Sequence, residues 1–435
     1  MRTHLAFSPK NRILLQIIVY WNPDDISCTF LNYIPPVYEV IIKKREVVAC
    51  PKGCQGEIKT APKPKHILPK AKFTESVLAH IIVSKLDDRQ PYYHLEKQFK
   101  KHAGFDLSRS TMPSATIKCT EALQPLVNLM KDEIIDYDIG ALDATGFQVL
   151  NEPGRSAQRK SYAYCIRGGP PDKESIIYSY NAEKHKQFVN EWFEGFSGAL
   201  HCDGDPFFEL MFEKGEIKAN FCNAHSRRKF EPIAKATLGD GLAKEAMRFY
   251  KRLYKIERKA KDQKLSSDQR HALRQEESKP LMDEFKQWLE KYQLRQKIAV
   301  PLLEDLNKWL DQKIEKTSKG GLTYKAMFYT LNQWEKLIRY CEDGRLHISN
   351  AGAENVIRPF AVGRRRWLFC DTPRGAKGSA IHYSLIETAK ANDINPDEYY
   401  HYILPRIAEA DTVEKLKSGK HCSPGILKTL LKKYA

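Results

Sequence analysis

Two aspartates stand in stretches of sequence where an ionised side chain is costly. Asp143 interrupts the apolar and β-branched run YDIGALDATGFQVL (137–150), and Asp203 directly follows the short apolar run GALHC (198–202). Burying a lone carboxylate costs several kcal/mol unless it is paired or binds a metal. If the two runs are adjacent parallel strands, both carboxylates lie near one sheet edge, and a divalent cation between them relieves their repulsion. A strand-end aspartate that caps a turn is the alternative.

A third carboxylate, Glu354, lies in the segment SNAGAENVIRPF. Ser349 or Asn350 is expected to cap a short helix that Pro359 ends. Glu354 and Arg358 then lie four residues apart on one helix face. An exposed ion pair, worth under about 1 kcal/mol, is therefore the alternative to a catalytic role for Glu354.

Three such carboxylates fit metal-assisted phosphoryl transfer. Two Mg²⁺ ions about 4 Å apart activate the attacking oxygen and stabilise the leaving oxygen. Mg²⁺ takes oxygen ligands and only a few carboxylates, because water and substrate phosphate complete its shell. Since the chain has 54 acidic residues, the triple carries weight only through its local sequence context.

The elements expected to position these carboxylates form an α/β unit. Alternating patterns predict strands at residues 137–150, 160–169, 175–183, 198–205 and 215–225. One helix is predicted at residues 184–196, between the third and the fourth strand. Three antiparallel strands, a crossover helix and a fourth strand beside the first is the ribonuclease-H-like order. We therefore predict an α/β fold with a ribonuclease-H-like core made of residues 135–239 and 345–410.

Helical periodicity dominates other parts of the chain. Apolar residues at helical spacing predict three helices in residues 74–134, the third capped by Ser110 or Thr111 after a short turn. This arrangement fits a helix-turn-helix DNA reader, and a plain helical bundle is the alternative. Residues 240–344 are expected to form a large helical insertion in the core, and 411–435 a basic C-terminal tail.

The N-terminal region, residues 1–58, carries the sequence CPKGC with Cys50 and Cys54, and Cys28 is its one other cysteine. Cys50 and Cys54 are candidate Zn²⁺ ligands in a partial zinc-binding unit. The proline- and lysine-rich stretch 59–73 that follows is expected to be an extended basic linker. It suits contact with a DNA backbone, and a plain spacer is the alternative.

The composition favours a polyanionic partner. The chain of 435 residues has 71 Lys and Arg against 54 Asp and Glu, a formal net charge of +17. Such an excess favours nucleic acid over a membrane surface, with a merely basic housekeeping protein as the alternative. The ten cysteines show no even framework and are expected to be reduced thiols. The apolar run ILLQIIVYW is too short to span a bilayer, so we predict a soluble, cytoplasmic protein.

The chain resembles the transposases of the bacterial insertion-sequence-sixty-six family from about Cys50 to Arg406. The resemblance rests on ordered motifs: CPKGC, IKTAPKPKHILPK, LAHIIVSKLDDRQPYYHLEKQF, LSRST, ALDATGFQVL, CDG, CNAHSRRKF, SNAGAENVIRPFAVGRRRWLF and YSLIETAKAN. So many matches in order are far more specific than a single short motif. The family likeness implies the same interrupted ribonuclease-H-like core that the strand pattern predicts.

The resemblance also implies an Asp-Asp-Glu triad, matched by Asp143, Asp203 and Glu354, that binds Mg²⁺ or Mn²⁺. The implied reaction begins when a water-derived hydroxide cuts the DNA at the ends of the element. The freed 3′-hydroxyl then attacks target DNA. The implied partners are terminal inverted repeats, target DNA, further copies of the chain in a homo-oligomer, and accessory proteins of the same element. The implied location is the nucleoid in the bacterial cytoplasm.

Two basic blocks are expected to contact DNA. The residues concerned are Arg227, Arg228, Lys229, Arg358, Arg364, Arg365 and Arg366. A solvated charged face is the alternative for each block. In the first block, Cys222 and His225 have metal-ligand character, but two ligands do not make a zinc site. A packed thiol and a hydrogen-bonded imidazole are the alternative.

Two positions depart from the family pattern. Ala144 follows the first aspartate, where an acidic residue is frequent, and Asp205 stands where an aromatic residue is usual. Asp205 and, more distantly, Glu209 are therefore rival metal ligands. A catalytically decayed DNA-binding remnant and a host ribonuclease-H-like nuclease are the alternatives to an active transposase.

Overall fold

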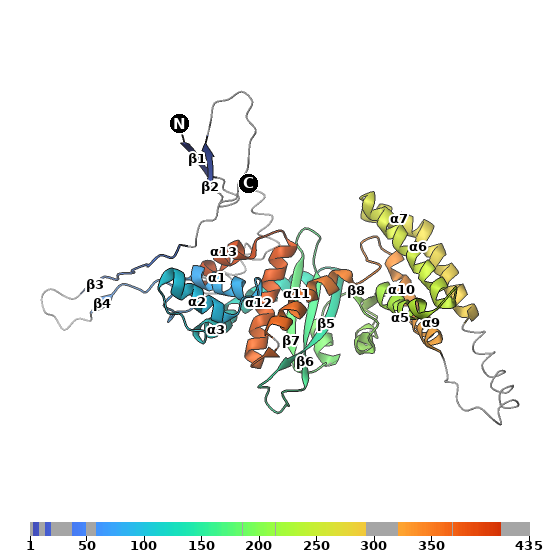
Figure 1. The fold of residues 1–435 in the computed structure, drawn as a ribbon, viewed down its shortest axis with the longest axis horizontal. Helices are drawn as coiled ribbons and strands as arrows, with labels where there is room; N and C mark the ends of the chain where they lie inside the picture. The colour runs from blue at the N-terminus through green and yellow to red at the C-terminus, as the bar shows by residue number, and fades with distance from the viewer. Residues whose placement is uncertain are drawn as a thin grey trace.

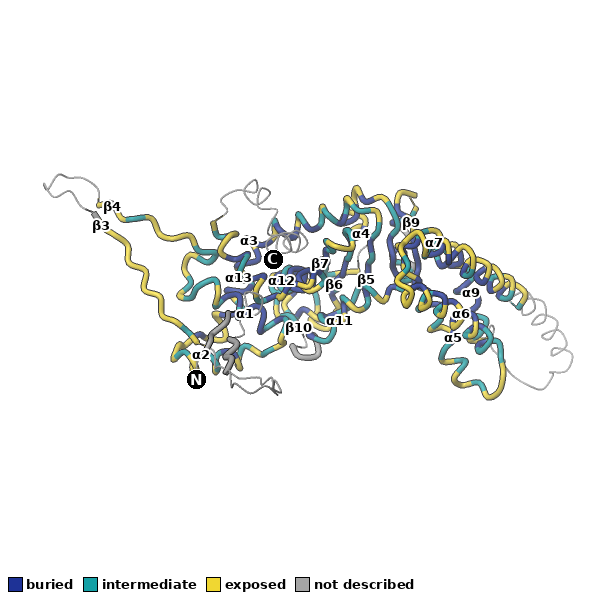
Figure 2. The backbone as a smooth tube through the Cα atoms, turned by 90° about the horizontal axis from the view of Figure 1, so that it is seen from above, coloured by how far each residue is buried: buried dark blue, intermediate teal, exposed yellow. Residues whose placement is uncertain are grey.

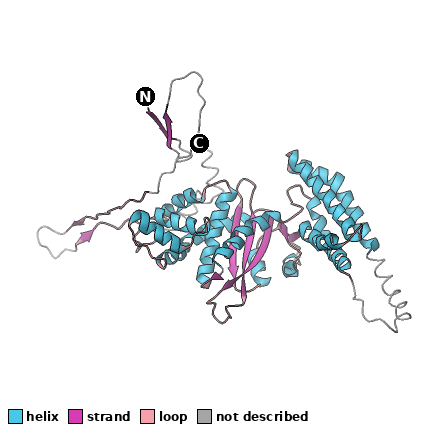
Figure 3. Cartoon of the chain, in the orientation of Figure 1, coloured by secondary structure: helices cyan, strands magenta, loops and turns pink. Residues whose placement is uncertain are grey.

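The computed structural model describes residues 3–7, 14–18, 37–48, 58–184, 186–213, 215–292, 321–367 and 369–409. It is a mixed α/β structure in which a central sheet has helices at both of its ends (Figures 1 and 3). Buried residues run through the sheet and the helices packed on it, whereas the arm near the N-terminus is exposed (Figure 2). Two short antiparallel pairs lie in the N-terminal region, namely β1 (Thr3–Phe7) with β2 (Leu14–Ile18) and β3 (Val47–Val48) with β4 (Lys59–Thr60). The candidate zinc ligands Cys50 and Cys54 lie outside the described residues.

The central sheet has the strand order β7-β6-β5-β8-β9, and β10 also pairs with β5. Its strands are β5 (Ile139–Val149), β6 (Lys160–Gly168), β7 (Ser175–Asn181), β8 (Gly198–Cys202), β9 (Ile217–Phe221) and β10 (Phe369–Cys370). Neighbours β5, β6 and β7 are antiparallel, whereas β8 is parallel to β5 and β9 is parallel to β8. The predicted strands, and the predicted parallel pairing of the first with the fourth, are confirmed. The helix between β7 and β8, α4 (Lys186–Trp192), is shorter than predicted.

The middle of one edge of β5 is open to other elements. On one side β6 pairs with β5 from Gly140 to Gln148. On the other side β8 pairs with Ile139–Ala141 and β10 with Gln148–Val149. Within the described chain, the stretch of this edge around Asp143 therefore has no strand beside it, and the side chains of a later helix can approach the aspartate there.

The outer edge of β7 is covered by α12 (Pro373–Ala391). The Ser384 hydroxyl accepts a hydrogen bond from the backbone N–H of Tyr178 (2.8 Å). The Thr388 hydroxyl likewise accepts from the N–H of Ile176 (2.9 Å) and donates to the carbonyl of the same residue (2.9 Å). These side chains satisfy backbone groups that an edge strand otherwise leaves unpaired.

Helices from both ends of the chain pack together beside β7. They are α1 (Glu75–Leu86), α2 (Tyr92–Ala103), α3 (Thr111–Ile135), α12 and α13 (Pro396–Glu409). The three helices predicted for residues 74–134 are therefore confirmed. Ser110 lies at the start of α3 without a side-chain cap, and the Ser108 hydroxyl accepts the N–H of Thr111 (3.2 Å) in its place.

The described residues between β9 and Glu354, which are 222–292 and 321–353, are mostly helical and lie at the opposite end of the sheet (Figure 1). Their elements are α5 (Asn223–Ala236), α6 (Leu242–Asp262), α7 (Ser267–Leu273), the helical residues 279–292, α9 (Leu322–Asn332) and α10 (Trp334–Ile338). The predicted capping box of Ser266 and Gln269 is present at α7. Arg339, just after α10, donates to the carbonyl of Ala219 on β9 (3.1 Å), so this sheet edge is occupied as well. None of the described helices is long and apolar enough to cross a membrane.

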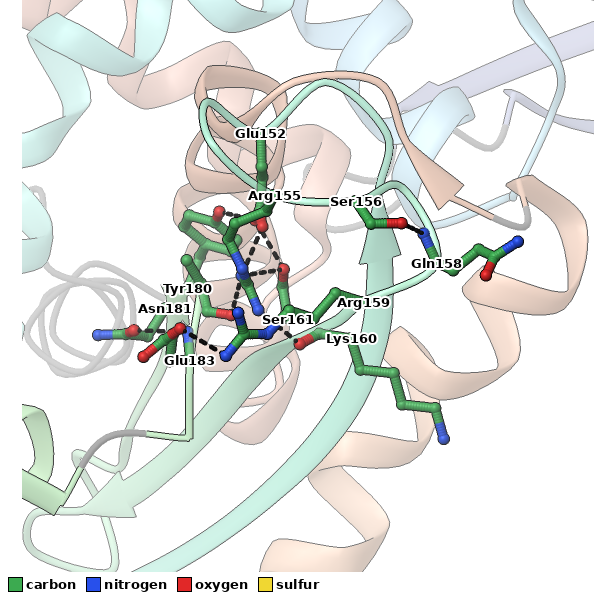
Figure 4. Close-up of polar contacts among 11 residues, drawn as sticks. Glu152, Arg155, Ser156, Gln158, Arg159, Lys160, Ser161, Tyr180, Asn181 and Glu183 are labelled. Atoms are coloured by element: carbon green, nitrogen blue, oxygen red, sulfur yellow. Dashed lines mark hydrogen bonds and ion pairs between the residues drawn. The ribbon is translucent and has the colours of Figure 1, made fainter.

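A closed polar network holds the turn between β5 and β6 (Figure 4). The buried Glu152 carboxylate accepts hydrogen bonds from Arg155, from the Ser161 hydroxyl (2.6 Å) and from the Tyr180 hydroxyl. Arg155 also donates to the carbonyl of Lys160 (3.2 Å). Because the buried charge has several donors, this network fixes the turn and with it the register of β5, the strand that carries Asp143.

Candidate active site

Asp143 lies on β5, and Asp203 directly follows the last residue of the adjacent parallel strand, β8. Ala141 of β5 is the register partner of His201 of β8, and each aspartate lies two residues further along its chain. Residues two apart point to the same face of a strand, and neighbouring strands lie about 4.8 Å apart. The pairing of β5 with β8 therefore brings the two carboxylates to one place on the sheet.

The third carboxylate is delivered by α11 (Ala351–Trp367), whose first turn contains Glu354. Asn350, just before the helix, is buried and donates from its side-chain amide to the carbonyl of Leu142 (3.1 Å), the residue before Asp143. Its backbone N–H donates to the Cys222 sulfur (3.1 Å). Its carbonyl accepts the first helical hydrogen bond, from Glu354 (2.9 Å). Asn350 thus occupies the predicted cap position, but its side chain anchors the helix to β5 and does not cap it.

The prediction that Pro359 ends this helix is wrong, because α11 continues to Trp367. A proline inside a helix removes one backbone donor. The carbonyl that loses its partner belongs to Asn355, an exposed residue. Phe360 is buried next to the proline, with its ring 5.3 Å from that of Phe147, and this packing holds the helix in place. The predicted DNA contacts Arg364, Arg365 and Arg366 lie in the last turns of α11, and only their backbone is described.

Glu354 is held by α5 and not by its own helix. Arg228 donates to one carboxylate oxygen (2.8 Å), and Nδ1 of His225 lies 3.6 Å from the other. Arg358, the expected partner on α11, is exposed, and within the described chain Glu354 has its ion partners on α5. Charge-assisted hydrogen bonds such as that from Arg228 fix orientation as well as charge.

The other two carboxylates influence Asp143 electrostatically. Burial raises the pKa of Asp143 to about 6, and the charges of Asp203 and Glu354 add to the rise. Burial also raises the pKa of Asp203, against the opposing effect of His225. Like charges crowded into a partly buried site favour a bound cation.

The carboxylate oxygens of this site fit a divalent metal ion. Oδ1 of Asp203 and Oε1 of Glu354 are buried and have no hydrogen-bond partner within the described part of the chain. Such oxygens are costly unless something satisfies them, and a cation held jointly with Asp143 would do so. All three residues offer the oxygen ligands that Mg²⁺ and Mn²⁺ accept.

A second cluster shares the same glutamate. The ligand atoms of Cys222, His225 and Glu354 lie within 4.8 Å of one another. Arg228 can only donate, and its guanidinium lies 3.1 Å from Nε2 of His225, so this nitrogen accepts. Burial and Arg228 lower the pKa of His225, so the imidazole is neutral and carries its proton on Nδ1, toward Glu354. At 3.6 Å, Nδ1 makes no hydrogen bond to Glu354, and in this tautomer neither ring nitrogen of His225 offers a free lone pair to zinc.

The rival ligand Asp205 already has partners. It accepts hydrogen bonds from Lys184 and from the N–H of Phe207 (3.0 Å). Burial alone would raise its pKa, but the bond with Lys184 keeps that pKa below the ordinary value. Glu209 lies in the 3₁₀ helix Pro206–Phe212 that follows β8, and nothing is described of its side chain.

The first predicted DNA-binding block lies along α5. Arg228 faces Glu354, as described above. Arg227 pairs with Glu231 (3.3 Å), and the Lys229 ammonium lies 5.0 Å from the ring centre of Tyr329. The block is therefore held by protein contacts on the same side of the molecule as the carboxylates.

Two residues of the site were missed by the sequence analysis in the roles they have here. The buried side chain of Asn350 joins α11 to β5, and Tyr329 of α9 covers Gly204, next to Asp203. A methyl group added at Gly204 would lie 2.4 Å from the Tyr329 hydroxyl, so only glycine leaves room for this contact. Sequence gives little signal for either contact, because in each case the partner lies far away in the chain. The glycine directly after Asp203 is the one local hint that something packs closely there.

Comparison with known proteins identifies the family. A model described as the transposase IS66 family matches residues 70–294 and 290–378, and one described as the IS66 C-terminal element matches 384–418. The chain is 28% identical to the uncharacterized protein y4hP of Sinorhizobium fredii over 89% of this chain and 68% of that protein. It is 26% identical to the uncharacterized protein y4jD of the same organism, over 88% and 72%. The chain therefore belongs to the IS66 family of transposases.

Proposed function

We propose that the chain is a DNA transposase that cuts DNA at the ends of an insertion sequence and joins the cut ends to target DNA. Asp143, Asp203 and Glu354 act as the ligands for Mg²⁺ or Mn²⁺. The observation that carries the proposal is their convergence from two parallel strands and one helix. Asp203 and Glu354 lie close enough to raise the pKa of Asp143.

The sheet supports a ribonuclease-H-like core for residues 135–239 and 345–410. Its order β7-β6-β5-β8-β9, with β8 and β9 parallel to β5, is the order expected of such a core. On this proposal residues 240–344 are the helical insertion, and residues 74–134 are the helical DNA-binding region. A homo-oligomer on DNA, help from accessory proteins and Zn²⁺ at Cys50 and Cys54 remain predictions.

A divalent metal held by these carboxylates supplies Lewis acidity and lowers the pKa of an attacking water. The chain's own residues keep the ligands in position, since Arg228 holds Glu354 and Asn350 fixes its helix to β5. In cleavage, a water oxygen bonds to phosphorus as the P–O3′ bond breaks, which leaves a 3′-hydroxyl. In transfer, that hydroxyl bonds to a target phosphorus and the target 3′-oxygen departs.

The test uses the full chain with labelled DNA that carries the element's own inverted repeat and flank, with Mg²⁺ or Mn²⁺. Asp143→Asn, Asp203→Asn and Glu354→Gln are each expected to lower cleavage by about 10³-fold or more, while melting curves confirm folding. Asp205→Asn is expected to cost far less, because Lys184 already pairs with that carboxylate. Undiminished cleavage by Asp143→Asn would contradict the proposal.

Two other results would point to the alternative functions. Specific binding of the repeat by the wild-type chain without any cleavage would indicate a decayed remnant. Cleavage with no preference for the repeat would indicate a general nuclease.

A further inference from the structure

We infer that a basic groove beside the carboxylates binds the phosphate backbone of the DNA next to the scissile phosphate. The inference rests on the proposed function and assigns it a substrate-binding surface. The groove, called here the α6 groove, has a volume of about 1310 Å³ and lies between α6, the first turns of α5 and α11, and residues 347–349. Eight basic and two acidic side chains line it.

The α6 groove lies beside the candidate active site, although none of the three carboxylates is part of its lining. Its lining includes Ala351 and Gly352, in the same helical turn as Glu354. It also includes Ala224 and Arg227, on either side of His225 in α5. A strand that lies in the groove therefore leads to the carboxylates. Because those carboxylates repel phosphate, a strand needs positive charge close by to remain there.

The two flanks of α6 differ in how their positive charges are used. On the flank away from the groove, Arg252 pairs with Glu284 (3.2 Å) and Lys259 with Glu277. On the groove flank, Arg248 pairs with Asp240 (2.6 Å). Three further basic residues there, Lys251, Arg258 and Lys261, have neither an ion pair nor a side-chain hydrogen bond with any residue that the structure describes. Positive charge on this flank is thus left available for a ligand.

The spacing of these charges suits a nucleic-acid backbone. Along a helix that rises 1.5 Å per residue, Arg258 lies about 10 Å and Lys261 about 15 Å from Lys251. Phosphates of one DNA strand follow each other every 3.4 Å along the duplex axis, so such a row can contact several of them. The row carries no base-reading pattern, and we assign it to sequence-independent backbone contacts.

The experiment compares two double variants of the full chain, each of which removes two positive charges from α6. Lys251→Gln with Lys261→Gln alters the groove flank, and Arg252→Gln with Lys259→Gln alters the other flank. Binding to a mixed-sequence duplex of about 30 base pairs is measured over a range of salt concentrations. Each lost phosphate contact lowers the slope of log affinity against log salt by about 1. The groove variant is expected to lose about 2 from the slope and to bind about 10- to 100-fold more weakly at 0.1 M salt.

The control variant is expected to keep the wild-type slope. Equal losses in both variants, or no loss in the groove variant, would overturn the inference. Asp143→Asn separates this inference from the proposed function, because it is expected to bind the duplex normally. If wild type and Asp143→Asn cleave equally, the proposed function fails whatever the groove does. If only wild type cleaves and the groove variant binds normally, the groove inference alone fails.

Discussion

Asp143 on β5 and Asp203, directly after the end of β8, each lie two residues beyond the register partners Ala141 and His201. Burial raises the pKa of Asp143, and the charges of Asp203 and Glu354 add to the rise. The pairing of β5 with β8 ends at Ala141 and His201, just before the two aspartates, and so brings them close together. A bound cation or a proton on Asp143 removes the unfavourable energy of its buried charge.

The first prediction concerns pH and Asp143. Its native pKa of about 6 exceeds the ordinary 3.8, so between these values the native state holds a proton that the unfolded chain has released. The free energy of unfolding of the metal-free protein should fall by up to about 3 kcal/mol as the pH rises from about 4 to about 6, and stay lower above that. Asp143→Asn should lack this fall, as measured by urea denaturation in chelator.

Metal should reverse the same effect. Mg²⁺ at pH 7 should raise the melting temperature of the wild type, because it binds the native carboxylates, and should not raise that of Asp143→Asn. Wild type and variant curves that run parallel across pH, or equal stabilisation by Mg²⁺, would be inconsistent with a shared carboxylate site.

The second prediction concerns Arg228, which holds Glu354. Arg228→Gln should lower the cleavage rate about 10- to 100-fold at saturating metal and DNA, because Glu354 loses its orienting donor. The metal concentration that gives the half-maximal rate should not rise, because the variant also loses a positive charge that repels the metal ion. Arg374→Gln is the matched control, because Arg374 pairs with Glu121 (2.6 Å) on an exposed surface away from the site. A loss of equal size in both variants would mean that Arg228 has no special role.

The third prediction concerns Asn350. Asn350→Ala leaves the buried carbonyl of Leu142 without its donor, so the free energy of unfolding should fall by about 1–3 kcal/mol. The cleavage rate should fall by more than the decrease in the folded fraction, because the start of α11 is no longer fixed to β5. Asn355→Ala, at an exposed position of the same helix, is the control. Normal cleavage by folded Asn350→Ala would show that the anchor is dispensable.

The fourth prediction concerns Gly204 and Tyr329. Gly204→Ala places a methyl carbon 2.4 Å from the Tyr329 hydroxyl, and this overpacking should cost about 1–3 kcal/mol. Tyr329→Phe removes that oxygen, and the next nearest ring carbon is 3.3 Å away. The double variant should therefore be more stable than the sum of the single effects, by at least about 0.5 kcal/mol in a thermodynamic cycle. Strict additivity would contradict the contact.

The strands that carry the aspartates could be predicted from sequence, because alternation and β-branched residues are local signals. The parallel pairing of the strands around Asp143 and Asp203 also followed, since few topologies connect three antiparallel strands, a helix and a fourth strand. The end of α11 could not be predicted from Pro359. A proline's local cost was outweighed by the burial of Phe360 against Phe147, and that packing exists only in the folded sheet.

The ion partner of Glu354 likewise could not be predicted from its neighbours in the sequence. The spacing of four residues made Arg358 the obvious choice, but α5 approaches from another part of the chain and presents Arg228. In the same way, Asn350 looked like a helix cap because caps depend only on neighbours in sequence. Its actual contact, the carbonyl of Leu142, is set by how α11 meets β5.

The covered edges of the sheet bear on how copies of the protein meet. Ser384 and Thr388 occupy the free side of β7, and Arg339 occupies that of β9. Neither border can accept a strand from a second molecule unless these bonds are first broken. A homo-oligomer of the kind predicted above is therefore not expected to form by pairing of central-sheet edges between two copies.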